Sequence, residues 1–236
     1  MNFLTAATHL LITLPSLIYH TTINKYAYYF GGDPIIDNEN KDIREVIIFV
    51  HGRGGFRTDF HPLINNLKNI PFILKAINLG DTRDTSIDED CLKLHEELEP
   101  YEGYNIILVG LSKGGMVVAK YPLLYKDKRI EKIITISAPL KGTHIASFAI
   151  FSPITKKELM CGSDICKEIQ QNSTIPMYHV VPKYDHMIVP NNSAKLDDTP
   201  EDNIYYYDGY YAHNGILYSP DVANAIIRWV LPIQVI

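Results

Sequence analysis

The sequence predicts an α/β fold with a mostly parallel central sheet of about six strands and helices on both of its faces. Apolar runs alternate along the chain with segments of helical spacing, and the runs are continuous, as in strands buried on both faces. The runs lie at residues 46–50, 73–79, 105–109, 133–137, 177–181 and 204–207. The helical segments lie at residues 87–98, 113–124 and 220–231. Ligands of such sheets bind beyond the carboxyl ends of the strands, so the candidate site is sought there.

Length and composition fit a single globular domain. The chain has 236 residues, of which 46% are hydrophobic and 21% are charged. The net charge is -5 and no basic run is present, which argues against a nucleic-acid partner. Three cysteines show no zinc-site spacing, and whether Cys161 and Cys166 pair stays open. We therefore expect no metal, and the composition does not indicate an oligomeric state.

Residues 1–44 are expected to form a lead-in segment before the main domain of residues 45–236. Residues 1–19 carry apolar side chains at helical spacing, which predicts an amphipathic helix docked on that domain. The stretch is too short and too interrupted to span a bilayer. No Lys or Arg precedes it, so the basic region of a signal peptide is missing, and this favours a cytoplasmic location. An atypical secretion signal and a peripheral membrane contact through residues 1–19 remain as alternatives.

Residues 110–114 read Gly-Leu-Ser-Lys-Gly, which is the G-x-S-x-G pattern. The pattern alone would occur by chance in about one chain in ten of this length. Here it directly follows a predicted strand and opens a predicted helix, as a nucleophile elbow does. Gly110 and Gly114 let the backbone make a sharp turn, and Ser112 becomes the candidate nucleophile. The alternative is a helix N-cap serine in a glycine-rich turn.

A glycine-rich loop, His51-Gly52-Arg-Gly-Gly, follows the strand at residues 46–50. Acyl transfer needs amide donors aimed at the oxyanion that develops in the transition state. We assign these donors to the backbone N–H groups of Arg53 and Lys113, with His51 and Gly52 shaping the loop. A simple β-to-α turn is the alternative. The pattern G-x-G-x-x-G is absent from this loop, so no dinucleotide cofactor is expected, and no other cofactor is needed.

The general base should follow the nucleophile in the chain. His213 lies on a loop between the last predicted strand and the last predicted helix, which places it at the same edge of the sheet as Ser112. His144 and His186 are the competing candidates. His179 lies in the middle of a predicted strand and is expected to be packed in the core.

The acid that orients this histidine is expected between Ser112 and His213. Asp185 comes four residues after the strand at residues 177–181, and Asp164 and Asp208 are the alternatives. A carboxylate there would hold His213 in the useful tautomer. His213 would take the proton from Ser112, which attacks a carbonyl, and water would then release the acyl-enzyme.

Taken together, these segments resemble the α/β-hydrolase superfamily. More narrowly, they resemble bacterial triacylglycerol lipases and the related esterases that include GPI inositol-deacylase-like proteins. The match rests on the loop after residue 50, the elbow at 109–115, an S-x-P-x-x-G-T stretch at 136–143, and the acid and histidine segments at 185–190 and 213–220. It covers residues 45–232. The resemblance implies the α/β-hydrolase fold and hydrolysis of a small-molecule or lipid ester through a Ser-His-Asp triad.

The sequence departs from this family at two positions. Lys113 stands where Met or Gln is more usual, and Arg53 is polar where such lipases often carry an apolar residue. The segment from 143 to 176 is short, which implies a small or minimal lid and favours small or polar esters. The same triad would serve a thioesterase, an amidase or an acyltransferase, and a non-catalytic binding module could keep the fold. Tyrosines crowd the region of His213, either as rim packing or as a contact surface for substrate or bilayer.

Overall fold

The fold is built on one seven-stranded sheet with the order β1-β3-β2-β4-β5-β6-β7. The computed structural model describes residues 35–36, 43–148, 151–172, 175–209, 211 and 213–231. The strands are β1 (Ile35–Ile36), β2 (Glu45–Val50), β3 (Ile73–Ile77), β4 (Asn105–Leu111), β5 (Ile130–Ile136), β6 (Met177–Pro182) and β7 (Ile204–Tyr207). Strands β2 to β7 pair in parallel, which confirms the predicted parallel sheet. The short β1 pairs antiparallel with β3 and belongs to the predicted lead-in segment.

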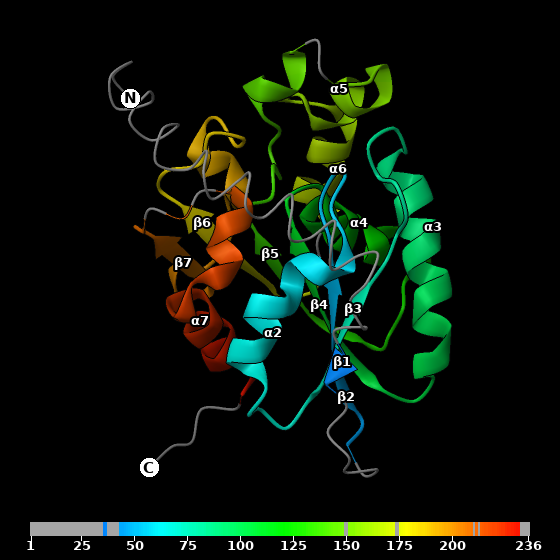
Figure 1. Ribbon diagram of the computed structural model, residues 1–236. Coiled ribbons are helices and arrows are strands. Elements are labelled where there is room, and N and C mark those ends of the chain that lie inside the picture. The colour runs from blue at the N-terminus through cyan, green and yellow to red at the C-terminus, as the bar shows by residue number, and fades with distance from the viewer. Residues whose placement is uncertain are drawn as a thin grey trace.

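Helices cover both faces of this sheet (Figure 1). Helices α2 (His61–Leu67) and α7 (Pro220–Val230) lie on one face and α3 (Ile87–Leu98) and α4 (Lys113–Tyr125) on the other, whereas α5 (Pro153–Leu159) and α6 (Asp164–Asn172) belong to the segment between β5 and β6. The side chains of Val46, Ile48 and Val50 pack with α3 and α4, whereas those of Ile47 and Phe49 pack with α2 and α7. All five are fully buried, which explains why the strand reads as one continuous apolar run.

Helix α3 begins where its sequence signals predict. Ser86 accepts a hydrogen bond from the Glu89 amide through its Oγ, and the Glu89 carboxylate accepts one from the Ser86 amide at 2.7 Å. This capping box satisfies two of the amides that the first turn of a helix leaves without partners. The first turn is acidic, but one of its acids, Asp90, is fully buried rather than solvated.

The predicted amphipathic helix of residues 1–19 lies outside the described residues. Within the part of the chain that the structure describes, no helix is both long and apolar enough to cross a membrane. Cys161 and Cys166 are free thiols, the first exposed and the second buried. No disulfide joins these two cysteines in this structure.

The turn between β4 and α4 consists of one residue, Ser112, with φ 55° and ψ -123°. Such a conformation costs a non-glycine residue about 1–3 kcal/mol and persists only where its surroundings enforce it. The enforcement comes from close packing of the glycines around it. A Cβ atom on Gly114 would lie 2.3 Å from the carbonyl oxygen of Val50, and one on Gly115 would lie 2.3 Å from Cβ of Ala138.

Gly114→Ala is expected to lower the free energy of unfolding by at least about 2 kcal/mol, measured by urea denaturation. Alanine gains about 1 kcal/mol of helix propensity over glycine, but the contact with the Val50 carbonyl outweighs this gain. Gly103→Ala is the matched control, because Gly103 has a positive φ and nothing within 4 Å of its added Cβ. Its cost is about 1 kcal/mol of backbone strain. A Gly114→Ala protein as stable as Gly103→Ala would contradict this account.

Candidate active site

The side chains of Ser112, His213 and Asp185 form one hydrogen-bonded chain beyond the carboxyl ends of β4, β7 and β6. Nε2 of His213 lies 2.9 Å from Oγ of Ser112. Nδ1 of the same ring lies 2.9 Å from Oδ2 and 3.2 Å from Oδ1 of Asp185. Ser112 makes no side-chain cap hydrogen bond to α4, so its hydroxyl is not used as a helix cap. The structure therefore brings together the three side chains that the sequence singled out.

Asp185 is enclosed by the protein and held by more than the histidine. Its Oδ1 accepts hydrogen bonds from the amides of Met187 at 2.8 Å and Ile188 at 3.3 Å. Burial by itself raises the pKa of this carboxyl, but the neighbouring His213 and the Met187 amide together hold the pKa below its usual value. The carboxylate can then only accept, so Nδ1 of His213 carries the proton and Nε2 faces Ser112 as an acceptor.

Of the competing histidines, only His186 lines the same pocket as Ser112. Its ring centroid lies 6.3 Å from that of His213, and burial lowers its pKa. His144 opens a short 3-10 helix, and its amide donates to the carbonyl of Val189 at 2.8 Å. Its side chain is not part of the hydrogen-bonded chain at Ser112.

His179 is fully buried in β6, as its position in the sequence predicts. Its ring nitrogens lie 2.7 Å from Oγ1 of Thr135 and 3.0 Å from Oγ1 of Thr199. Burial lowers its pKa to about 3, so the ring is a neutral part of the core. The alternative acids are surface residues: Asp208 pairs with Lys183, and Asp164 pairs with a lysine of α6.

The loop after β2 is fixed by His51. Nε2 of this buried ring accepts a hydrogen bond from the Leu79 amide at 3.1 Å, and Nδ1 lies 3.0 Å from the carbonyl oxygen of Gly52. Burial lowers the pKa of His51, so the ring is neutral and Nδ1 donates to Gly52. A Cβ atom on Gly52 would lie 2.9 Å from Cβ of Ser112, so the backbone passes directly beside the candidate nucleophile.

Thr82 holds the same loop from a second side. Its hydroxyl donates to the Gly52 carbonyl at 2.8 Å and accepts from the Gly54 amide at 2.9 Å. Arg53, between these glycines, lines the pocket of Ser112. Lys113 directly follows Ser112 as the first residue of α4, where a backbone N–H has no acceptor within the helix. Of the two residues assigned as oxyanion donors, Lys113 is therefore next to Ser112 in the chain, and Arg53 lines the same pocket as Ser112.

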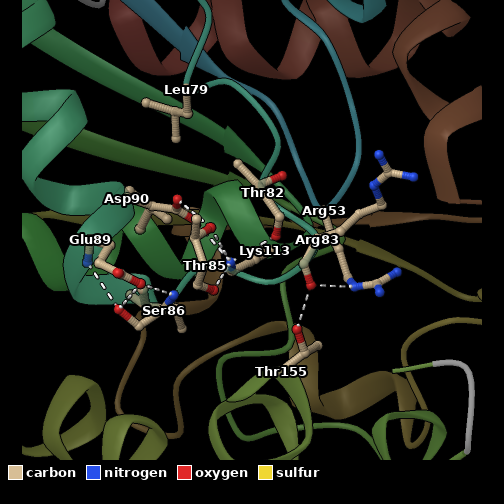
Figure 2. Close-up of polar contacts among 12 residues, drawn as sticks. Arg53, Leu79, Thr82, Arg83, Thr85, Ser86, Glu89, Asp90, Lys113 and Thr155 are labelled. Atoms are coloured by element: carbon tan, nitrogen blue, oxygen red, sulfur yellow. Dashed lines mark hydrogen bonds and ion pairs between the residues drawn. The ribbon is translucent and has the colours of Figure 1, made fainter. Parts of the chain in front are cut away.

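The side chains of these two donor residues point in different directions. The guanidinium of Arg53 lies over the ring of Phe151, 4.8 Å from its centroid, and its Nε donates to the carbonyl of Arg83 at 3.2 Å. Lys113, in contrast, does not line the pocket: its side chain is almost fully buried and lies beside Thr82, Thr85 and Asp90 (Figure 2). The polarity of Lys113 therefore has no bearing on the polarity of the pocket mouth.

The pocket at Ser112 has a volume of about 270 Å³. Its apolar lining residues are Leu111, Pro139, Ala146, Phe151, Leu159, Met187 and Ile188. Three of them, Ala146, Phe151 and Leu159, come from the short segment that was expected to form a small lid. Among the described residues, no group of three or more His, Cys, Asp or Glu side chains is arranged to hold a metal ion.

No family model and no curated protein sequence matches this chain. Solved structures do match it at low sequence identity. Aspergillus fumigatus lipase B is 14% identical with a TM-score of 0.66, and the match covers 80% of this chain and 54% of the lipase. Bacillus licheniformis lipase BlEst2 in its mature form is 16% identical with a TM-score of 0.65, over 86% of this chain and 100% of the lipase.

A third match comes from a protein with a different activity in its name. Bromoperoxidase from Bacillus anthracis is 15% identical with a TM-score of 0.61, and the match covers 80% of this chain and 92% of that protein. The chain spans only about half the length of the fungal lipase but nearly all of the two bacterial proteins. At these sequence identities the comparisons establish the fold alone. The narrower resemblance to GPI inositol-deacylase-like proteins stays a prediction. The chain has the α/β-hydrolase fold.

Proposed function

We propose that this chain is a serine hydrolase that cleaves carboxylic esters. The observation that carries the proposal is the continuous hydrogen-bonded chain from Ser112 through His213 to a buried, ionised Asp185. A strained serine before a helix N-terminus, facing a partly apolar pocket, is the arrangement that acyl transfer needs.

In this mechanism Nε2 of His213 removes the hydroxyl proton as Oγ of Ser112 bonds to the ester carbonyl carbon. The carbonyl oxygen gains the negative charge and is held by the N–H groups of Arg53 and Lys113, supported by the dipole of α4. The imidazolium of His213, stabilised by Asp185, then gives its proton to the departing alcohol. Water attacks the acyl-enzyme in the same way and regenerates Ser112.

The pocket supports a short acyl group as the substrate moiety. Its volume of about 270 Å³ lies at the lower limit for small-molecule sites. Phe151 and Leu159, contributed by the short lid segment, close it with apolar surface. A small, neutral acyl group fits these walls better than a long chain does.

Other acyl chemistry fits the same three side chains, because a triad does not by itself select ester over thioester, amide or acyl transfer. The bromoperoxidase with this fold shows that architecture leaves the reaction open. We favour ester hydrolysis because the pocket joins a mainly apolar wall to the serine. Membrane contact through residues 1–19 stays a prediction, since those residues lie outside the described part of the chain.

Labelling with a fluorophosphonate tests the nucleophile directly. Wild-type protein is expected to be labelled, whereas Ser112→Ala should lose both the label and at least about 10⁵-fold in kcat. Ser86→Ala is the matched control, because that serine is a true helix cap. It should lose about 1 kcal/mol of stability and keep full labelling. Folded wild-type protein that takes up no label would favour a non-catalytic binding module.

A series of p-nitrophenyl esters tests the acyl group. We expect kcat/KM for acetate or butanoate to exceed that for palmitate by at least about tenfold, because the pocket cannot enclose a long chain. Thioester and anilide analogues in the same series separate the alternative chemistries. A preference for the palmitate ester would overturn the assignment of a short acyl substrate.

Asp59 places an ionisable carboxyl group in the wall of the pocket. It is buried, lines the pocket, and its Oδ2 accepts a hydrogen bond from the Phe56 amide at 2.9 Å. Burial raises its pKa to about 6, and the Phe56 amide lowers it only in part. Near neutral pH the carboxylate is therefore mostly charged, which disfavours anionic acyl groups by repulsion.

The raised pKa of Asp59 also predicts a dependence of stability on pH. The fold favours the protonated acid, so this contribution is complete below the unfolded pKa of about 4 and is lost as pH rises through about 6. Asp59→Asn keeps an accepting oxygen but stays neutral. Its free energy of unfolding relative to wild type should rise by about 2–3 kcal/mol from pH 4 to pH 8, measured by urea denaturation. A difference that does not vary with pH would contradict this prediction.

A further inference from the structure

The ammonium group of Lys113 is enclosed by the protein directly behind the candidate nucleophile. Its Nζ lies 2.8 Å from Oδ2 of Asp90 and donates to the carbonyl oxygens of Thr82 at 2.9 Å and Thr85 at 2.6 Å. The lysine side chain is 1% exposed and the aspartate side chain 0%. A third hydrogen bond goes to Oγ1 of Thr85 at 3.2 Å, so the two threonines accept all three protons of the ammonium and Asp90 supplies the opposite charge (Figure 2).

Such a pair is not explained by stability. Removing two charges from water costs several kcal/mol each, and apolar replacements of a buried pair are often as stable or more so. Lys120, two turns along the same helix, is also buried but pairs with the exposed carboxylate of Glu168. The two lysines therefore lie on the same helix and each forms an ion pair, but only the ion pair of Lys113 is hydrogen-bonded to the loop beside Ser112.

The link to the site runs through Thr82. Its carbonyl oxygen accepts from Lys113, while its hydroxyl binds the Gly52 carbonyl and the Gly54 amide. The first residue of α4 and the loop on both sides of Arg53 are thereby tied to one threonine. These two segments carry the two backbone amides that we assign to the oxyanion.

We propose that the Lys113 side chain is a positioning residue that, through Thr82, sets the spacing between the amides of Arg53 and Lys113. This inference rests on the proposed function. The ammonium reaches no substrate, since Lys113 does not line the pocket, and it acts only on the placement of backbone donors. Asp90 balances its charge, and Thr85 joins the pair by donating to Oδ1 of Asp90 at 2.7 Å.

The loop that Lys113 holds is also the attachment point of the lid helix α5. Thr155 donates through Oγ1 to the Arg83 carbonyl at 2.9 Å, and the Ile87 amide donates to the carboxylate of Glu158 at 2.9 Å. Figure 2 shows Thr155 and Arg53 meeting at the same Arg83 carbonyl. Loss of the lysine is therefore expected to loosen residues 82–87 as a unit.

The test compares Lys113→Met with Lys113→Met/Asp90→Leu, which removes both charges and leaves no orphaned carboxylate. Both should lose about 10- to 100-fold in kcat on a short-chain p-nitrophenyl ester, with KM changed less than about threefold. Affinity for a trifluoromethyl ketone, which forms a tetrahedral oxyanion on the serine, should fall by the same factor. Thr82→Val, which leaves the ion pair intact, should reproduce the loss.

Lys120→Met is the matched control and should keep kcat within about twofold, because its ion pair does not reach the oxyanion loop. Amide hydrogen exchange at residues 52–55 and 82–87 should accelerate in the double variant and in Thr82→Val, but not in Lys120→Met. This readout does not depend on turnover.

The inference is overturned if wild-type protein hydrolyses the ester and the double variant, folded and as stable, keeps kcat within about twofold. It is also overturned if exchange at residues 52–55 is unchanged. If Lys113→Met alone fails to fold, the double variant and Thr82→Val still decide the question. Failure of the proposed function looks different, because wild-type protein itself would then show neither fluorophosphonate labelling nor ester hydrolysis.

Discussion

The whole site depends on the close approach of backbone segments at the start of α4. Gly114 and Gly115 leave no room for side chains against Val50 and Ala138, and this crowding holds Ser112 in its strained conformation. The same approach places the N-terminus of α4 beside the loop after β2. A chain that relaxed here would lose the orientation of the hydroxyl and the alignment of the amides together, because both depend on the close packing at the start of α4.

Much of the architecture is readable from the sequence because parallel strands buried on both faces leave an unmistakable apolar pattern. The helix at residues 87–98 is equally legible from its helical spacing, and the structure gives α3 these same bounds. Short helices are not: α2 and α5 have seven residues each, which is too few for a period to emerge. The edge strand β1 has two residues and is defined only by its pairing with β3.

The sequence predicts those residues of the candidate site that occupy fixed positions relative to the strands. Ser112, Asp185 and His213 each follow a strand that the apolar pattern identifies, so topology alone predicts their convergence. The supporting residues Thr82 and Asp90 carried no such signal. An acid in the first turn of a helix normally faces water and the helix dipole, and only the tertiary structure turns Asp90 inward to Lys113. Lys113 departs from the residues that are more usual after the nucleophile, but the sequence does not show in which direction its side chain points.

His51 limits the stability of the loop in acid, independently of the chemistry proposed for His213. Its ring holds the loop only while Nε2 has a free lone pair for the Leu79 amide. A second proton would place two donors face to face in a buried space, and the loop would have to open. Because burial lowers the pKa of this ring, the opening is deferred to more acidic solutions than an exposed imidazole would tolerate. Protonation of this buried histidine would therefore release the loop that carries one of the proposed oxyanion donors.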